Sequence, residues 1–187
     1  MTFGAWQHVG ARNGFEVAFL NRAGDEHRVE GDTTAVEGGA AWAVHYRISL
    51  DSGWRTRHAH VVGRSEGGRR ELTLQCDENG RWQVDGAHAP HLDGCLDVDL
   101  ESSALTNAFP AQRLGLQVGE QAEAPAAYVR ALDMGVERLE QRYARLADDG
   151  HRRRYHYTAP RFDFECELVY DESGLVLDYP GIATRAA

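Results

Sequence analysis

The chain contains no lysine, and arginine supplies all 20 of its basic residues. This absence excludes a Schiff-base lysine, a P-loop lysine and a lysine general base. The 29 acidic residues outnumber the basic ones and give a formal net charge of −9 at pH 7. Because nucleic acids and anionic membranes attract clustered cations, we expect no nucleic-acid partner and no stable membrane insertion.

Cysteines and long apolar runs are also scarce. Cys76, Cys95 and Cys166 are far apart and form no Cys-x-x-Cys pair, which favours reduced thiols over a disulfide framework. No apolar run is long enough to span a bilayer, and the first residues lack the basic and apolar regions of a signal peptide. These features predict a cytoplasmic protein.

Common catalytic signatures are missing as well. The sequence has no Walker loop, no G-x-G-x-x-G after a strand, no G-x-S-x-G and no H-E-x-x-H. Their absence lowers the expectation of an enzyme, and we expect no cofactor and no metal ion.

Alternating apolar and polar residues dominate the sequence and are typical of half-buried strands. The clearest run extends from Ala41 to Asp51 and a second one from Phe162 to Tyr170. Asn79-Gly80 lies between two shorter runs, and both residues tolerate the positive φ of a tight hairpin. The sequence therefore predicts an all-β, antiparallel fold. Nothing marks a domain boundary, so we expect a single domain over residues 1–187.

One segment fits two kinds of secondary structure. Val136, Leu139, Tyr143 and Leu146 have the 3-4-3 spacing of an amphipathic helix. Leu139 and Tyr143 also lie on one side of a strand, together with Gln141 and Arg145. The residues alone leave both possibilities open.

The segment from Leu92 to Glu101 is the most unusual part of the chain. If it is a strand, one face carries leucines and Val98, and the other carries a row of acids around Cys95. Successive carboxylates about 7 Å apart repel one another unless water, arginine, a metal or a polyhydroxyl ligand compensates. An ordinary solvated strand face is the alternative. We expect arginine or backbone donors to hold at least two of Asp93, Asp97 and Asp99.

His58-x-His60 places two imidazoles on one face of a predicted strand, as in some metal sites. A packed or partly exposed pair is the alternative. If these histidines met the Asp97/Asp99 face, the protein would be a hydrolase or a metal-dependent enzyme, and this is the second functional hypothesis.

Several motifs resemble a bacterial family catalogued as putative glycolipid-binding. They are Leu92–Leu100, Leu105-Thr-Asn, Pro110 with Arg113-Leu114, Gln141-Arg-Tyr143 and Gly174-Leu-Val with Tyr179-Pro-Gly. The resemblance implies a long antiparallel sheet rolled into a spiral β-roll or half-barrel, with few short helices, and a strand around Leu139. Family members tend to carry two arginines before the leucine, whereas this chain has only Arg113 and departs from the family pattern at this point.

A rolled sheet with one apolar face encloses either a filled core or a cavity. Six aromatic residues are candidates to line such a cavity: Trp42, Tyr46, Trp54, Trp82, Phe162 and Phe164. Polar groups at its rim would hold sugar hydroxyls or a phosphate. The candidate ligand-binding residues, several of them in the family motifs, are Asp97, Asp99, Thr106, Asn107, Arg113, Tyr143, Tyr179 and Trp54.

The resulting hypothesis is a lipid- or glycolipid-binding protein without catalytic activity. It places the acyl chain of an amphipathic small molecule in the apolar cavity and the headgroup at the polar rim. An interaction module that forms a homodimer through a sheet edge is a third possibility.

Overall fold

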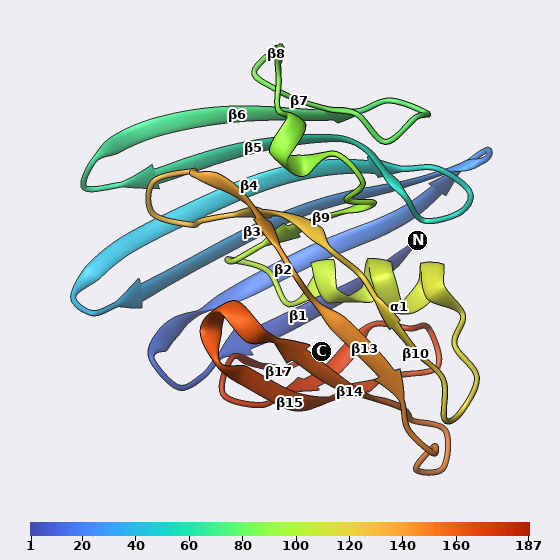
Figure 1. Ribbon diagram of the computed structural model, residues 1–187. Helices are drawn as coiled ribbons and strands as arrows, with labels where there is room; N and C mark the ends of the chain where they lie inside the picture. The colour runs from blue at the N-terminus through green and yellow to red at the C-terminus, as the bar shows by residue number, and fades with distance from the viewer.

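The computed structural model describes residues 1–187 and contains one long, curved sheet (Figure 1). Strands hold 58% of the residues and helices 9%, which confirms the all-β prediction. The long sheet contains β1 (Thr2–His8), β2 (Arg12–Ala23), β3 (Glu26–Glu37), β4 (Ala40–Leu50), β5 (Thr56–Ser65), β6 (Gly68–Cys76), β7 (Trp82–Val84), β8 (Ala87–His88), β10 (Gln121–Glu123), β13 (Arg142–Arg145), β14 (Arg153–Ala159), β15 (Phe164–Tyr170), β16 (Val176–Tyr179) and β17 (Ala183–Arg185).

The two ends of the chain meet in the middle of this sheet. Its 14 strands follow the order β10-β13-β14-β15-β16-β17-β1-β2-β3-β4-β5-β6-β7-β8, and all neighbours are antiparallel. The first and last strands, β1 and β17, are therefore neighbours. The sheet does not close into a barrel, which agrees with the rolled, open sheet expected from the sequence.

A second, three-stranded sheet and the short helices complete the fold. These elements are β9 (Asp97–Leu100), β11 (Ala126–Val129), β12 (Val136–Leu139), α1 (Ala108–Leu114), η1 (Pro90–Leu92), η2 (Leu105–Asn107) and η3 (Pro160–Phe162). In Figure 1, β9 and α1 lie between the β1–β6 arm and the β13–β17 arm of the long sheet. None of the helices has the length and apolar character that crossing a bilayer requires.

Strand alternation predicts burial correctly where one face of a strand meets the core. In β4 the buried side chains are the alternating apolar ones: Trp42, Val44, Tyr46, Ile48 and Leu50, each at most 3% exposed. Asn79-Gly80 lies in the connection between β6 and β7, where Cys76 pairs with Trp82 and Gly80 has a φ of 77°. The predicted hairpin is therefore present.

The segment with two possible structures forms strands, as the family resemblance implied. Val136–Leu139 pairs with β11, and Arg142–Arg145 pairs with β10 and β14. Two separate strands in different sheets share the segment. Pairing with distant strands decides the outcome here, because helical spacing alone is a weak preference.

The acidic segment differs from the simple alternating strand expected. Pro90–Leu92 is a turn of 3₁₀-helix, and only Asp97–Leu100 is a strand. All four residues of β9 are buried, including Asp97 at 1% and Asp99 at 8% exposure. Because β9 lies inside the curved sheet, both of its faces are covered, and Asp97 and Asp99 form no solvated acidic face.

Candidate ligand-binding cavity

A cavity of about 220 Å³ lies between β9, β11 and the β14–β16 part of the long sheet. Nine of its 14 lining residues are hydrophobic; the lining is Arg12, Asp99, Leu100, Glu101, Ser103, Asn107, Tyr128, Leu139, Tyr157, Ala159, Phe162, Phe164, Tyr179 and Ile182. Phe162, at 48%, is the most exposed of the lining residues. A larger hollow of about 520 Å³ near Arg57 and His58 has only one hydrophobic lining residue. An apolar cavity with a few converging polar groups is the better candidate for a binding site.

Aromatic rings form one wall of the cavity and support one another. The ring centroids of Tyr157 and Tyr179 are 6.0 Å apart, and those of Phe164 and Tyr179 are also 6.0 Å apart, in edge-to-face arrangements. Tyr128 and Phe162 are 5.5 Å apart on another part of the lining. Edge-to-face pairs fix ring orientation, so the wall is preorganised.

Asp99 is the buried acid of this cavity. One carboxylate oxygen accepts a hydrogen bond of 2.9 Å from the Thr106 hydroxyl, and the other accepts one of 2.5 Å from Gln141 Nε2. Both donors are neutral. Burial raises the pKa of Asp99 to about 6, and the neighbouring charges of Asp97 and Glu101 add to this shift.

The charge of Asp99 acts on two of the tyrosines that line the cavity. Burial raises the pKa of Tyr157 and of Tyr179, and the Asp99 carboxylate raises both further. The acid and these two rings therefore belong to one electrostatic environment inside the cavity.

Asp97 has a different position and a different partner. It forms a two-point ion pair with Arg113, at 3.2 Å to Nε and 2.5 Å to Nη2. Burial raises the pKa of Asp97, and the guanidinium opposes this shift. Neither residue lines the cavity; the pair joins β9 to α1. Asp93 accepts a hydrogen bond from the Trp82 backbone N–H at 3.1 Å. Arginine or backbone donors thus hold two of the three acids, as expected.

Asn107 lines the cavity, whereas two residues predicted beside it lie behind the wall. The Tyr143 hydroxyl donates to Asn107 Oδ1 at 3.0 Å, and the Tyr170 hydroxyl donates to the Asn107 carbonyl at 3.0 Å. Thr106 supports Asp99. Thr106 and Tyr143 are buried and fix the lining residues without lining the cavity themselves.

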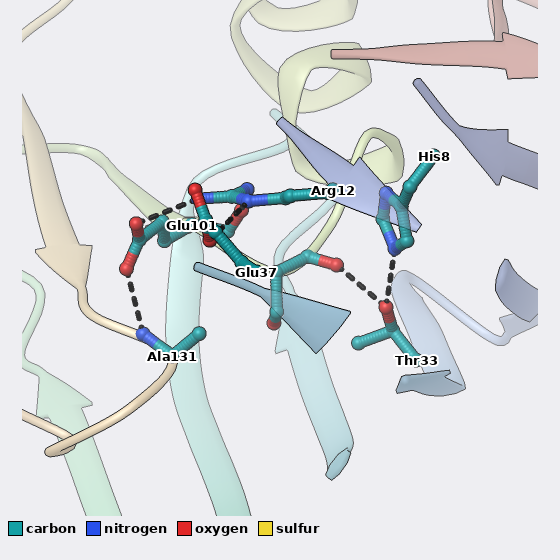
Figure 2. Close-up of polar contacts among 7 residues, drawn as sticks. His8, Arg12, Thr33, Glu37, Glu101 and Ala131 are labelled. Carbon is teal, nitrogen blue, oxygen red and sulfur yellow. Dashed lines mark hydrogen bonds and ion pairs between the residues drawn. The ribbon is translucent and has the colours of Figure 1, made fainter. Parts of the chain in front are cut away.

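Arg12, at the start of β2, supplies a cation to the wall, and Figure 2 shows its polar contacts. Its Nε donates to Glu37 at 2.9 Å, and its Nη2 donates to Glu101 Oε1 at 2.7 Å. Nη1 donates to the Glu101 carbonyl at 2.5 Å, and Glu101 Oε2 accepts from the Ala131 N–H at 2.8 Å. Two carboxylates therefore neutralise this guanidinium, and all three of its nitrogens have partners.

Several lining residues did not emerge from the sequence, among them Arg12, Ser103 and Tyr157. Arg12 reaches Glu101 across 89 positions of sequence, so no local spacing could reveal the contact. Tyr157 belongs to an alternating run, and alternation indicates which face is buried without indicating what that face covers.

Several aromatic residues that were predicted to line the cavity lie elsewhere in the structure. Trp54 stacks on His27 with ring centroids 4.0 Å apart and does not line the cavity. Trp42, Tyr46 and Trp82 are packed in the core; of the six aromatic candidates, only Phe162 and Phe164 line the cavity.

The structure does not bring His58 and His60 to Asp97 and Asp99. Both histidines are half-buried on the face of β5 opposite to the core residue Ala59, and His60 contacts Glu71 at 2.7 Å. Asp97 and Asp99 lie inside the curved sheet. No group of three or more His, Cys, Asp or Glu side chains is arranged to hold a metal ion.

Comparison with known proteins shows which family this chain belongs to. A family described as "Putative glycolipid-binding" matches residues 4–185. The crystal structure of a DUF1089 family protein from Pseudomonas aeruginosa is similar, with 36% identity, a TM-score of 0.77 and 91% of each chain covered. A β-barrel-like protein of family DUF1849 from Brucella abortus shares the fold at 9% identity, with a TM-score of 0.50 over 98% of this chain and 93% of that one. Among curated proteins none matches. Because the family match extends over nearly all residues, the chain belongs to the putative glycolipid-binding family.

Proposed function

We propose that the protein binds an amphipathic small molecule of the glycolipid type in the cavity beside Asp99, without catalysing a reaction. One observation carries this proposal: aromatic rings and planar polar side chains converge on the same partly open cavity. Rings pack against the apolar face of a sugar, while Asp99 and Asn107 offer acceptors and donors for its hydroxyls. The family membership supports the same ligand class.

The size of the cavity limits which part of such a ligand it accepts. Its volume is about 220 Å³. A cavity of about 150 Å³ holds one benzene ring, whereas sites for drug-sized ligands measure about 300–1,000 Å³. The cavity therefore has room for one ring or a short piece of chain. This favours a headgroup ring inside and the acyl chain outside, past Phe162, which reverses the arrangement expected from the sequence.

Isothermal titration calorimetry tests this proposal. Octyl glucoside below its critical micelle concentration should bind saturably with a Kd of about 1–100 μM, corresponding to roughly 5–8 kcal/mol. Octanol and glucose, which each carry half of the ligand, should bind more weakly. Calorimetry is preferable to tryptophan fluorescence because none of the four tryptophans lines the cavity.

A variant that fills the cavity provides the control. Ala159 lines the cavity and is 1% exposed, so Ala159→Phe should abolish binding while the thermal unfolding curve stays cooperative. Glu66→Gln, at an exposed turn outside the cavity, should bind like the wild type. If no amphiphile binds saturably, or if Ala159→Phe binds unchanged, the proposed function is wrong.

We also propose that residues 1–187 form a single domain. It is supported by one cluster of 40 buried residues that draws members from β1 to β17.

A further inference from the structure

Asp99 is a buried carboxylate without a cationic partner. Its two hydrogen-bond donors, Thr106 and Gln141, are neutral. The nearby cations are used elsewhere, because Arg113 pairs with Asp97 and Arg12 pairs with Glu37 and Glu101. A buried charge without a counter-charge is costly to the fold. Such an unpaired acid on a cavity wall is a candidate for function.

The Asp99 carboxylate also retains capacity to accept hydrogen bonds. An ionised carboxylate has about four acceptor positions, and protein donors occupy one on each oxygen of Asp99. Asp99 lines the cavity together with Tyr157 and Tyr179. A donor in the cavity can therefore reach it.

The other walls suit a cation as well. Five aromatic residues line the cavity: Tyr128, Tyr157, Phe162, Phe164 and Tyr179. The negative faces of aromatic rings attract cations, and cages of such rings recognise ammonium groups. Glu101 brings a second acid to the lining, so that acids outnumber cations there.

We propose that this cavity selects ligands that carry a protonated amine or a quaternary ammonium on a ring-sized group, with Asp99 as the counter-charge and the aromatic rings as the cage. The inference rests on the proposed function and names the ligand chemistry of the same site. An amino sugar and a trimethylammonium headgroup share this chemistry, and each has a size comparable to the volume of about 220 Å³.

A phosphate or carboxylate group fits this cavity poorly. All three guanidinium nitrogens of Arg12 already donate to Glu37 or Glu101. An anion would therefore meet Asp99 and Glu101 without gaining a free cation, and like charges in a site of low dielectric repel strongly.

Two pairs of probes that differ in charge test the inference by calorimetry at pH 7.0 and about 150 mM salt. The first pair is octyl 2-amino-2-deoxyglucoside and octyl glucoside. The second pair is choline and its neutral isostere 3,3-dimethylbutanol. The cationic member of at least one pair should bind at least tenfold more tightly. A preference in the first pair indicates amino sugars, and one in the second indicates trimethylammonium headgroups.

The neutral probes distinguish a failure of the charge preference from a failure of the proposed function. If the neutral and cationic members bind equally, the inference is wrong while the proposed function stands. If no probe binds, both fail. If octyl glucoside binds more tightly than its amino analogue and choline shows no advantage, the cavity selects neutral sugars and the inference is overturned.

The variant Asp99→Asn tests whether the Asp99 carboxylate causes the preference for cationic probes. The variant should lose at least tenfold in affinity for the preferred cationic probe and change less than threefold for its neutral partner. Glu66→Gln removes the same charge at an exposed turn and should leave both affinities unchanged. An unchanged charge preference in Asp99→Asn would contradict the inference.

The wild-type protein provides a second test that does not depend on the variant folding. Choline keeps its charge at every pH, so protonation of Asp99 at pH 5.0 should reduce its advantage over 3,3-dimethylbutanol at least fivefold. The titratable groups that face Asp99 are Asp97, Glu101, Tyr128, Tyr143, Tyr157 and Tyr179. Glu16 contacts the lining residue Ser103, and burial raises the pKa of Glu16 to about 6. The neutral probe corrects for non-electrostatic changes that protonation of Glu16 causes. An advantage that is independent of pH would overturn the inference.

Discussion

The Ser103 hydroxyl donates a hydrogen bond of 2.5 Å to Glu16 Oε1, across 87 positions of sequence. The same oxygen accepts the Tyr46 hydroxyl at 2.6 Å, and Oε2 accepts the Ala104 N–H at 2.7 Å. Glu16 is fully buried. This carboxylate therefore joins β2 and β4 to the turn after β9, and Ser103 in that turn lines the cavity. The cavity wall depends on a buried acid outside it.

Glu16→Ala should destabilise the protein strongly. It leaves the donors of Tyr46, Ser103 and Ala104 without their acceptor, and each unsatisfied buried group costs about 1–3 kcal/mol. A total loss of about 3–5 kcal/mol lowers the Tm by roughly 6–20 °C in a chain of this size. Differential scanning calorimetry measures this, with exposed Glu66→Ala as the control expected to stay within about 0.5 kcal/mol. A Tm within 2 °C of the wild type would contradict this role of Glu16.

Asp97→Asn should also lower the Tm, by roughly 6–20 °C. The substitution leaves the Arg113 guanidinium, 11% exposed, beside a neutral amide. Breaking a buried ion pair from one side costs about 3–5 kcal/mol. The double variant Asp97→Asn/Arg113→Gln should lose less than the sum of the two single variants, because both partners are then neutral. Strictly additive losses would show that the pair is not coupled. Glu123→Gln, in an exposed ion pair with Arg142, is the control expected to have little effect.

The sequence predicts those strands of the long sheet whose side chains alternate between a common core and solvent. In β4 the alternation from Trp42 to Leu50 corresponds directly to burial. The same reasoning fails for Asp97–Leu100, where all four residues are buried. The groups that cover its acids, Arg113 over Asp97 and Gln141 over Asp99, are distant in the sequence. The local alternation of apolar and polar residues can reveal one covered face of a strand. A strand that is covered on both faces can be recognised only from the tertiary fold.

The sequence predicts only part of the candidate site, because residues distant in the sequence form the rest of it. Asp99, Asn107 and Tyr179, which belong to the motifs shared with the family, line the cavity. Arg12 and Tyr157 come from strands that meet the cavity only after the sheet has rolled up. Trp54 was an attractive aromatic candidate, but it packs on His27 away from the cavity. Residue type predicts chemistry, whereas topology decides which residues share a site.

Asp99→Asn should behave differently from Asp97→Asn, although the two positions are neighbours on one strand face. The folded protein raises the pKa of Asp99 from 3.8 to about 6. Between these values the folded state holds a proton that the unfolded state has released, so wild-type stability falls as pH rises through this window. The asparagine does not titrate. The stability of Asp99→Asn relative to the wild type should therefore increase by about 2–3 kcal/mol between pH 4 and pH 7, at roughly 1.4 kcal/mol per pKa unit. Urea unfolding at both pH values measures this; an equal difference at pH 4 and pH 7 would show that the Asp99 pKa is not raised.

His8 should be neutral at pH 7, with its proton on Nε2. The Thr33 hydroxyl donates its single hydrogen to the Ser102 carbonyl at 2.8 Å, so His8 Nε2, at 2.9 Å from Thr33 Oγ1, must be the donor of that pair (Figure 2). Burial lowers the pKa of His8 to about 4, and the Arg12 charge contributes. Stability from the neutral ring is present above pH 6.5 and is lost as pH falls toward 4. ¹⁵N NMR should show the Nε2–H tautomer with a titration midpoint near pH 4. Thr33→Val should remove the preference for this tautomer. A proton on Nδ1, or a midpoint near 6.5 in the wild type, would show that the contact between β1 and β3 is not the one described.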